Sequence, residues 1–338
     1  MLSKRIVVIG GSNAVIEHSY PQVLESMGYD ITCYGIGDTT SLTGLTQILK
    51  HDILGNFDIM LFDYLTGDIN HFFRGCLTVE HVEKTLTVIY NLCAEHNIQL
   101  LPIFIYNSRY FPQSDLMNHS YDNCKMFAFY KKFIKDNALS YINVPEFLEK
   151  EFNDEWESAA YRDTVHLNKH GMRVLAETIA NNLNDLGTLT KIDDTTPGNV
   201  KLIPIETIKP TERFKNTLVD VDYHELSDSI EILFDKPTEL LAIEYLCDLE
   251  CGYISLETDQ ETIHRQTLIQ GGFVNTRKKS QLTTMVLCNK KSDPTNRVKI
   301  CVIDRPDKQL YSRHKSDFPT KLKEKTNLKL VSLLILEH

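Results

Sequence analysis

The chain has 338 residues, which is long for a single domain and suggests about two. Hydrophobic residues make up 42% of it and charged residues 24%, as in an ordinary soluble globular protein. The formal net charge of −10 argues against a protein that binds a nucleic-acid backbone, because such a protein needs a basic surface, so no nucleic-acid partner is expected.

The apolar runs and the cysteines of the sequence both bear on where the protein is expected to be located. The uninterrupted apolar run before the first glycines covers only residues 6–9, so no secretion signal is expected. No stretch approaches the roughly 20 apolar residues of a membrane span. The eight cysteines are scattered, and only Cys247 and Cys251 lie close together, without a second pair to complete a zinc site. We therefore expect a cytoplasmic protein with reduced thiols and no metal.

Strand-like and helix-like segments alternate over residues 1–185. Short apolar runs predict buried strands, and longer segments with apolar residues at helical spacing predict helices. The predicted strands cover residues 5–10, 30–37, 57–65, 98–107 and 139–145, and the predicted helices cover 19–28, 79–97, 121–138 and the segment after Asn168. This alternation predicts an α/β fold in which helices cover both faces of a parallel sheet.

The pattern changes near residue 185. Residues 186–200 contain Gly, Thr, Asp and Pro without periodicity, which predicts a linker. Short strand-like runs then cover residues 229–234, 239–247, 252–258, 264–269, 282–289, 297–304 and 328–337. Such closely spaced strands, separated by turn residues, predict an antiparallel all-β sandwich domain over residues 201–338.

Four segments of the first domain carry groups suited to acyl transfer. Ser12 follows the first strand, at the edge where doubly wound sheets bind ligands. Asp163 and His166 precede the last helix; a histidine can take the serine proton, and an aspartate can orient the imidazole. The N–H groups of Ser12 and Gly37 and the side-chain amide of Asn70 are candidate donors to the oxyanion.

Each of these residues, taken alone, has a simpler structural explanation. Ser12 could cap a turn, and His166 could be an ordinary loop histidine with Asp163 as its turn cap. Gly37 could merely shape a turn, and Asn70 could be a turn residue. The catalytic interpretation depends on all four segments standing in one order along the same sheet.

That order resembles the SGNH hydrolases, also called the GDSL-like esterase and lipase family. The family has successive Ser, Gly, Asn and Asp-x-x-His blocks, and this chain matches them with "GGSNAV", "YGIGDTTS", "TGDIN" and "DTVHLNKHG". The match covers about residues 4–185. It implies a flavodoxin-like parallel sheet, a serine triad and acyl-ester chemistry through an acyl-serine.

Two of the blocks depart from the family pattern. The first block usually reads Gly-Asp-Ser, and here Gly11 takes the place of the acid, which leaves the nucleophile in position. The third block usually reads Gly-x-Asn-Asp, and here Asn70 is shifted relative to Gly67. Asn70 is therefore the least secure of the assignments.

The acyl acceptor separates the functions that remain open. Water as the acceptor makes an esterase acting on an O-acetylated carbohydrate, which needs no cofactor. A sugar hydroxyl as the acceptor makes a polysaccharide O-acetyltransferase with acetyl-CoA as the donor. A third possibility is a carbohydrate-binding protein with a decayed site, against which the intact Ser12, Asp163 and His166 argue.

The appended β domain bears on the substrate by analogy alone. SGNH proteins with such a domain resemble carbohydrate-modifying enzymes, including those that act on O-acetyl groups of bacterial surface polysaccharides such as capsules. The β domain is expected to face carbohydrate or, as readily, to serve packing or homo-oligomer formation. Trp156 and Tyr161 could line an acyl pocket, although core packing is the simpler expectation.

Overall fold

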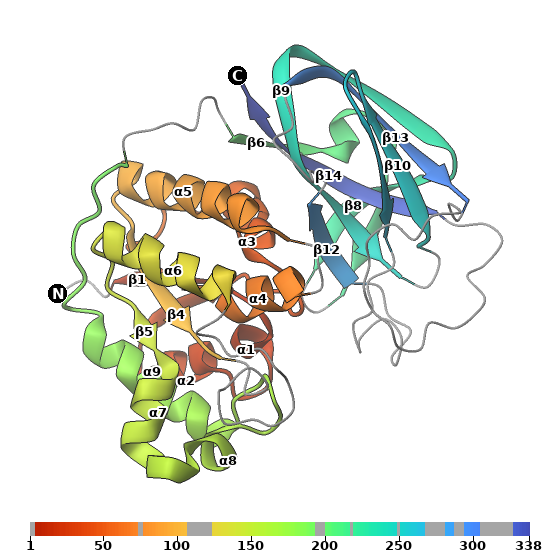
Figure 1. Cartoon of the computed structure of the whole chain (residues 1–338). Helices are drawn as coiled ribbons and strands as arrows, with labels where there is room; N and C mark the ends of the chain where they lie inside the picture. The colour runs from red at the N-terminus through yellow and green to blue at the C-terminus, as the bar shows by residue number, and fades with distance from the viewer. Residues whose placement is uncertain are drawn as a thin grey trace. The chain divides into compact units, whose positions relative to one another are not determined.

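A computed structural model describes residues 4–73, 77–106, 124–192, 200–216, 219–248, 251–267, 281–286, 294–304 and 327–338. The chain divides into two compact units (Figure 1). The first comprises Met1–Phe72 and Thr78–Asp194, and the second comprises Phe73–Leu77 and Thr195–His338. Residues 193–199 of the predicted linker lie outside the described residues.

The first unit is built on a five-stranded parallel sheet in the order β2–β1–β3–β4–β5. Its strands are β1 (Arg5–Gly10), β2 (Asp30–Cys33), β3 (Ile59–Asp63), β4 (Gln99–Phe104) and β5 (Ile142–Asn143). β3 is buried along its whole length, as its continuous apolar run predicts. This strand order is that of flavodoxin-like doubly wound sheets, so the predicted α/β fold class is confirmed.

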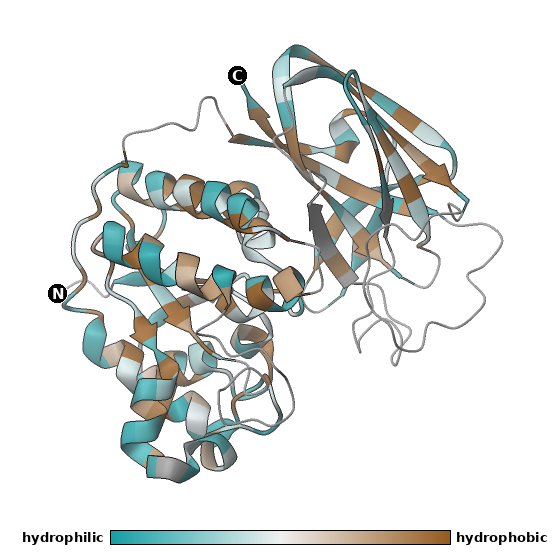
Figure 2. Ribbon diagram, viewed as in Figure 1, coloured by the Kyte–Doolittle hydropathy of each residue, from teal (hydrophilic) through white to brown (hydrophobic). Residues whose placement is uncertain are grey.

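Helices cover both faces of this sheet (Figure 1). One face carries α2 (Tyr20–Ser26), α7 (Val144–Phe152), α8 (Trp156–Ala160) and α9 (Lys169–Asn182), which share one apolar core with the sheet. The other face carries α3 (Ser41–Lys50), α5 (Val79–Glu95) and α6 (Lys125–Asp136), with α5 packed against both of its neighbours. Figure 2 shows brown, hydrophobic strands between helices that have both brown and teal faces.

Two short helices follow strands at the carboxyl edge of the sheet: α1 (Ser12–Val15) after β1, and α4 (Leu65–Phe73) after β3. Neither is predicted from the sequence, and nor are α3, α7 and α8. Helix α3 contains Gly44 and several Ser and Thr residues of modest helix propensity, and it is held by burial of nearly all its residues. The predicted strand 139–145 is shorter in the structure, because Val144 begins α7 with a proline in its first turn.

The second unit is antiparallel, with the strand order β11–β10–β13–β9–β14–β8–β7, while β12 pairs with β9 and β6 pairs with β14. The strands are β6 (Val200–Pro204), β7 (Glu212–Lys215), β8 (Asp220–Leu226), β9 (Ser229–Cys247), β10 (Tyr253–Thr258), β11 (Thr262–Gln266), β12 (Gln281–Val286), β13 (Thr295–Ile303) and β14 (Leu328–Glu337). The predicted all-β second domain is therefore confirmed. Strands β6, β7 and β8 are additions to the predicted set.

Strand β9 organises this unit. Its first half pairs with β13, and its second half pairs with β14 and β12. The sequence predicts two strands here, 229–234 and 239–247, but the structure joins them into one strand that contains Pro237. The pairing of β9 with β13 shifts in register at this point, from Leu233 to Thr238. The strands thus form one continuous sheet, which folds around a common apolar core instead of splitting into two separate sheets.

Candidate active site

Ser12 lies immediately beyond β1, as the first residue of α1, with Gly11 as the N-cap. The Gly11 N–H donates to the Asp63 carbonyl over 2.9 Å, which ties this turn to the end of β3. The backbone is closely packed just before it, since a Cβ on Gly10 would lie 3.1 Å from the Asp63 Cβ. Ser12 is therefore placed at the carboxyl edge of the sheet, as predicted.

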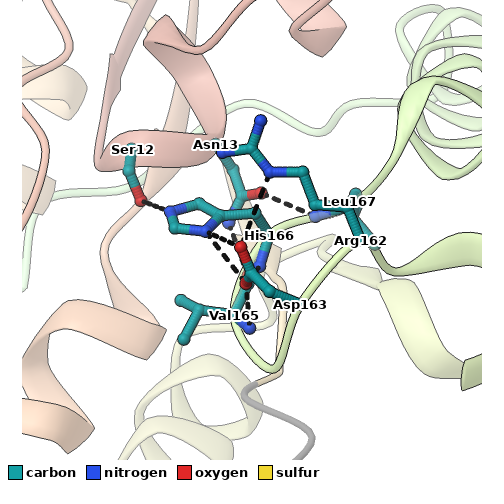
Figure 3. A network of polar contacts seen from close by, with 7 residues as sticks. All are labelled: Ser12, Asn13, Arg162, Asp163, Val165, His166 and Leu167. Atoms are coloured by element: carbon teal, nitrogen blue, oxygen red, sulfur yellow. Dashed lines mark hydrogen bonds and ion pairs between the residues drawn. The ribbon is translucent and has the colours of Figure 1, made fainter.

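The three predicted triad residues meet at this edge (Figure 3). The Ser12 Oγ lies 2.9 Å from the His166 Nε2. The His166 Nδ1 lies 2.8 Å from one Asp163 carboxylate oxygen and 3.0 Å from the other. With a proton on Nδ1 donated to the carboxylate, Nε2 is free to accept the serine proton, which is the tautomer that a general base requires.

The Asp163 carboxylate also shapes the loop that carries His166. Its Oδ1 accepts hydrogen bonds from the backbone N–H groups of Val165 (2.8 Å) and His166 (2.9 Å), as in an Asx turn. Partial burial raises the pKa of Asp163, but these bonds and the imidazole outweigh it and hold the pKa below its ordinary value. The side chains of His166 and Asp163 are 25% and 47% exposed, so neither is fully buried.

Asn13, which follows the nucleophile within "GGSNAV", is a site residue whose role is not predicted from the sequence. Its Nδ2 donates to the Val165 carbonyl, and its Oδ1 accepts from the Leu167 N–H, each over 3.1 Å (Figure 3). Its side chain is 4% exposed. The sequence feature that could have indicated this role is a polar residue directly after the nucleophile. The short helix α1 buries that residue.

Gly37 lies beside the nucleophile, as predicted. The Ile36 N–H donates to the Gly10 carbonyl over 2.9 Å, which extends the pairing of β2 with β1 beyond Cys33. A Cβ on Gly37 would lie 3.3 Å from the Ser12 Cβ. Its backbone therefore runs next to Ser12, and its role as an oxyanion donor remains a prediction.

Asn70 lies on helix α4 and is therefore not the turn residue that its sequence context allows. The segment is helical because Leu65 and Ile69, one turn apart, are both buried. The helix begins two residues after β3 and so still starts at the active-site edge of the sheet. Asn70 remains a predicted oxyanion donor.

The residues before Asn70 fix the Gly37 loop in place. A Cβ on Gly67 would lie 2.1 Å from the Thr39 carbonyl oxygen, so helix and loop are in direct contact. The buried Asp68 carboxylate accepts from the Ser41 N–H (2.8 Å) and the Tyr130 hydroxyl (2.6 Å). Burial raises the pKa of Asp68 to about 6 despite these bonds. Gly67 and Asp68 of the third block therefore have a structural role, because they hold helix α4 against the segment that follows Gly37.

A second buried acid lies beneath the nucleophile turn. Asp63, the last residue of β3, is 4% exposed, and its Oδ2 has no hydrogen-bond partner within the described part of the chain. Burial raises its pKa to about 7. Its main-chain carbonyl holds Gly11, while its side chain faces the core.

Tyr161 serves the core instead of an acyl pocket. Its hydroxyl donates to the Tyr106 carbonyl over 2.9 Å, and its ring packs edge-on against Trp156. Across the described ranges, no group of three or more His, Cys, Asp or Glu side chains could hold a metal ion. None of the helices in those ranges is long and apolar enough to cross a membrane.

Comparisons by sequence find no matching family model and no matching curated protein. Solved structures do match. A two-domain esterase active on acetylated mannans has a TM-score of 0.62 at 13% identity, over 99% of this chain and 91% of that one. An acetyl xylan esterase has a TM-score of 0.44 at 20% identity, over 53% of this chain and 99% of that one. A GDSL-like lipase from Bacteroides thetaiotaomicron has a TM-score of 0.43 at 16% identity, over 54% and 88%.

The first of these matches carries the conclusion, because it extends over nearly the whole of both chains. At 13% identity, this match shows a shared fold and nothing more specific. Its coverage takes in both the five-stranded parallel sheet and the separate antiparallel sheet of this chain. The chain therefore has the same two-domain fold as this esterase, with a parallel α/β domain followed by an antiparallel β domain.

Proposed function

We propose that this protein is a serine esterase that removes acetyl groups from a carbohydrate through an acetyl-serine intermediate. The observation that carries the proposal is the chain of contacts from the Ser12 Oγ to the His166 Nε2 and from the His166 Nδ1 to Asp163. Each residue stands in the order in which a triad transfers a proton. The three belong to two segments that only the folded sheet brings together.

In the first half-reaction, the Ser12 Oγ attacks the carbonyl carbon of the acetyl group while the His166 Nε2 takes the hydroxyl proton. The carbonyl oxygen becomes an oxyanion, for which the N–H groups of Ser12 and Gly37 and the Asn70 amide are the proposed donors. The tetrahedral intermediate then collapses, and the bond to the sugar oxygen breaks. His166 gives its proton to that oxygen, and the sugar leaves as an alcohol.

In the second half-reaction, water attacks the acetyl-Ser12 carbonyl, and the His166 Nε2 takes one of its protons. Collapse releases acetate, and the same proton returns to the Ser12 oxygen. Asp163 keeps its negative charge throughout and stabilises the imidazolium that forms twice in each cycle. Its lowered pKa suits this role, because the carboxylate stays ionised in mildly acidic solution.

The substrate class rests on the two-domain neighbour. That protein is described as active on acetylated mannans, and its likeness to this chain extends over both units. We infer that the β unit likewise takes part in handling an acetylated carbohydrate, while the α/β unit supplies the chemistry. Transfer of acetyl from acetyl-CoA to a sugar would use the same acetyl-serine, so the acceptor decides between the two reactions.

The test compares donors and acceptors in one assay. The protein is incubated with acetylated mannan, with acetylated xylan, and with acetyl-CoA plus the deacetylated glycans, and acetate and acetyl-sugars are followed by mass spectrometry. Acetate release from an acetylated glycan, lost in Ser12→Ala, supports the esterase. Acetyl-sugar formed only from acetyl-CoA would replace it with a transferase, and turnover that survives Ser12→Ala would refute the acyl-serine mechanism.

A further inference from the structure

The loop that carries the catalytic base has to be held in place against the nucleophile. The contacts made by the Asp163 carboxylate, with the Val165 N–H, the His166 N–H and the imidazole, all lie within the loop itself. They set the shape of the loop and the orientation of the ring. They do not set the distance between that ring and Ser12, which stands on a different segment 154 residues away.

Asn13 makes the connection between the two segments. Its Nδ2 donates to the Val165 carbonyl, and its Oδ1 accepts from the Leu167 N–H. Asn13 therefore binds the main chain on both sides of His166. Figure 3 shows the Asn13 side chain and the Ser12 hydroxyl reaching the same loop from α1. Because Ser12 and Asn13 are adjacent on one helical turn, anchoring the loop to one of them sets its distance from the other.

We infer that Asn13 is a positioning residue of the triad, which fixes the His166 Nε2 at bonding distance from the Ser12 Oγ by bridging the Val165 carbonyl and the Leu167 N–H. This inference rests on the proposed acyl-ester chemistry. Asn13 does not touch the reacting atoms. With 4% of its side chain exposed, it is also closed to the substrate, so it acts only through the loop.

A carboxamide suits this position for two reasons. Its NH₂ group can donate to the Val165 carbonyl while its oxygen accepts from the Leu167 N–H, so one planar group satisfies both partners. Gly11, on the other side of Ser12, has no side chain with which to hold the loop. Replacement of Asn13 by alanine leaves the Val165 carbonyl and the Leu167 N–H without this partner, and the loop is then free to shift.

The first test separates kcat from KM on a small acetyl ester such as p-nitrophenyl acetate. We expect Asn13→Ala to lower kcat by roughly 10²-fold, since a displacement of about 1 Å between reacting groups has an effect of that size. KM should change by less than about 3-fold, because the side chain does not reach the substrate. Asn91→Ala is the matched control: Asn91 is buried and its Oδ1 binds the distant Ile192 N–H, so that variant should lose stability but not kcat.

The second test is a double-mutant cycle with His166→Ala. If Asn13 acts through His166, adding Asn13→Ala to His166→Ala should lower the residual rate by less than about 3-fold. An equal loss in both backgrounds would overturn the inference, because it would show a general structural effect. Unchanged kcat in Asn13→Ala would overturn it as well. If Ser12→Ala and His166→Ala themselves keep full activity, the failure belongs to the proposed function instead.

Asn13→Asp keeps the cycle informative if the alanine variant does not fold. The carboxylate can still accept from the Leu167 N–H but cannot donate to the Val165 carbonyl. We expect a fall in kcat that is again absent in the His166→Ala background. A fall that persists without His166 would contradict the positioning role.

Discussion

The Ser12 Oγ lies 2.9 Å from the His166 Nε2, although 154 residues separate them. Two separate features make this proximity possible. β1 delivers Ser12 to the carboxyl edge of the sheet, and the loop before α9 returns to the same edge, where Asn13 binds it. The site is therefore a product of the parallel sheet, because only there do distant strand ends become neighbours.

Asp163→Asn should keep the fold and lose most of the rate. The new carboxamide can still accept hydrogen bonds from the backbone of the loop, but its NH₂ group facing the imidazole favours the wrong tautomer. We expect kcat on an acetyl ester to fall by roughly 10³–10⁴-fold with a melting temperature close to wild type. Glu177→Gln, an exposed acid on α9, is the control and should leave both unchanged. A rate within a few-fold of wild type would remove Asp163 from the triad.

Asn70→Ala tests the third oxyanion donor. Loss of one such donor typically lowers kcat by roughly 10²–10³-fold with little effect on stability. The comparison is Asn56→Ala, since the Asn56 amide bonds locally to the Asp52 carbonyl and should leave kcat unchanged. Steady-state kinetics on an acetyl ester decide the matter. If kcat is the same in both variants, the oxyanion is held by the N–H groups of Ser12 and Gly37 or by another donor.

Gly67→Ala should destabilise the protein. The added Cβ would lie 2.1 Å from the Thr39 carbonyl oxygen, which is backbone and cannot rotate away, so α4 or the Gly37 loop must shift. Overpacking of this kind costs about 1–3 kcal/mol, and more where backbone has to move. Thermal unfolding of Gly67→Ala and of the control Gly187→Ala, whose Cβ meets nothing within 4 Å, measures the difference. Equal melting temperatures would show that the contact is easily relieved.

Asp63→Asn should stabilise the protein at high pH. Burial raises the pKa of Asp63 from 3.8 to about 7 in the folded state, so the folded chain holds a proton that the unfolded chain releases. The free energy of unfolding of the wild type therefore falls as the pH rises from about 4 to about 7. The variant, with its neutral amide, has no such loss from this position. Between pH 5 and pH 8, the stability gap should widen in favour of the variant by roughly 2–3 kcal/mol.

Chemical denaturation at pH 5 and pH 8 measures this gap. The exposed acid Asp185, replaced by asparagine, serves as the control and should give no widening. A gap that stays constant with pH would show that Asp63 ionises normally in the folded state.

The sequence predicts those parts of the fold that have strong periodicity. β1, α5 and α9 have long apolar patterns, α5 and α9 have capping residues at Thr78 and Asn168, and their observed bounds lie close to the expected ones. Helix α3 is different, because its Ser, Thr and Gly residues form a helix only when tertiary packing encloses them. In the β unit, the join of two predicted strands into β9 depends on partners on both sides of Pro237, which local patterns do not contain.

The candidate site shows the same division. The residues with chemistry of their own, Ser12, Asp163 and His166, stand in recognisable blocks, and the structure brings them together. The sequence marks Asn13 by its place directly after the nucleophile but does not indicate its role, because that role arises from main-chain groups of a loop that is distant in sequence. The helical setting of Asn70 is hidden for a similar reason, since its short segment is helical through burial against the rest of the unit.

The central claim is that Ser12 is a nucleophile activated by His166, and labelling with a serine-directed phosphonate tests it most directly. We expect one adduct per chain, located by peptide mapping on the fragment that contains "GGSNAV", and labelling that is abolished in Ser12→Ala and nearly abolished in His166→Ala. His170→Ala, a neighbouring histidine on α9, should label as wild type. An adduct elsewhere, or labelling of Ser12 at the wild-type rate without His166, would contradict the account.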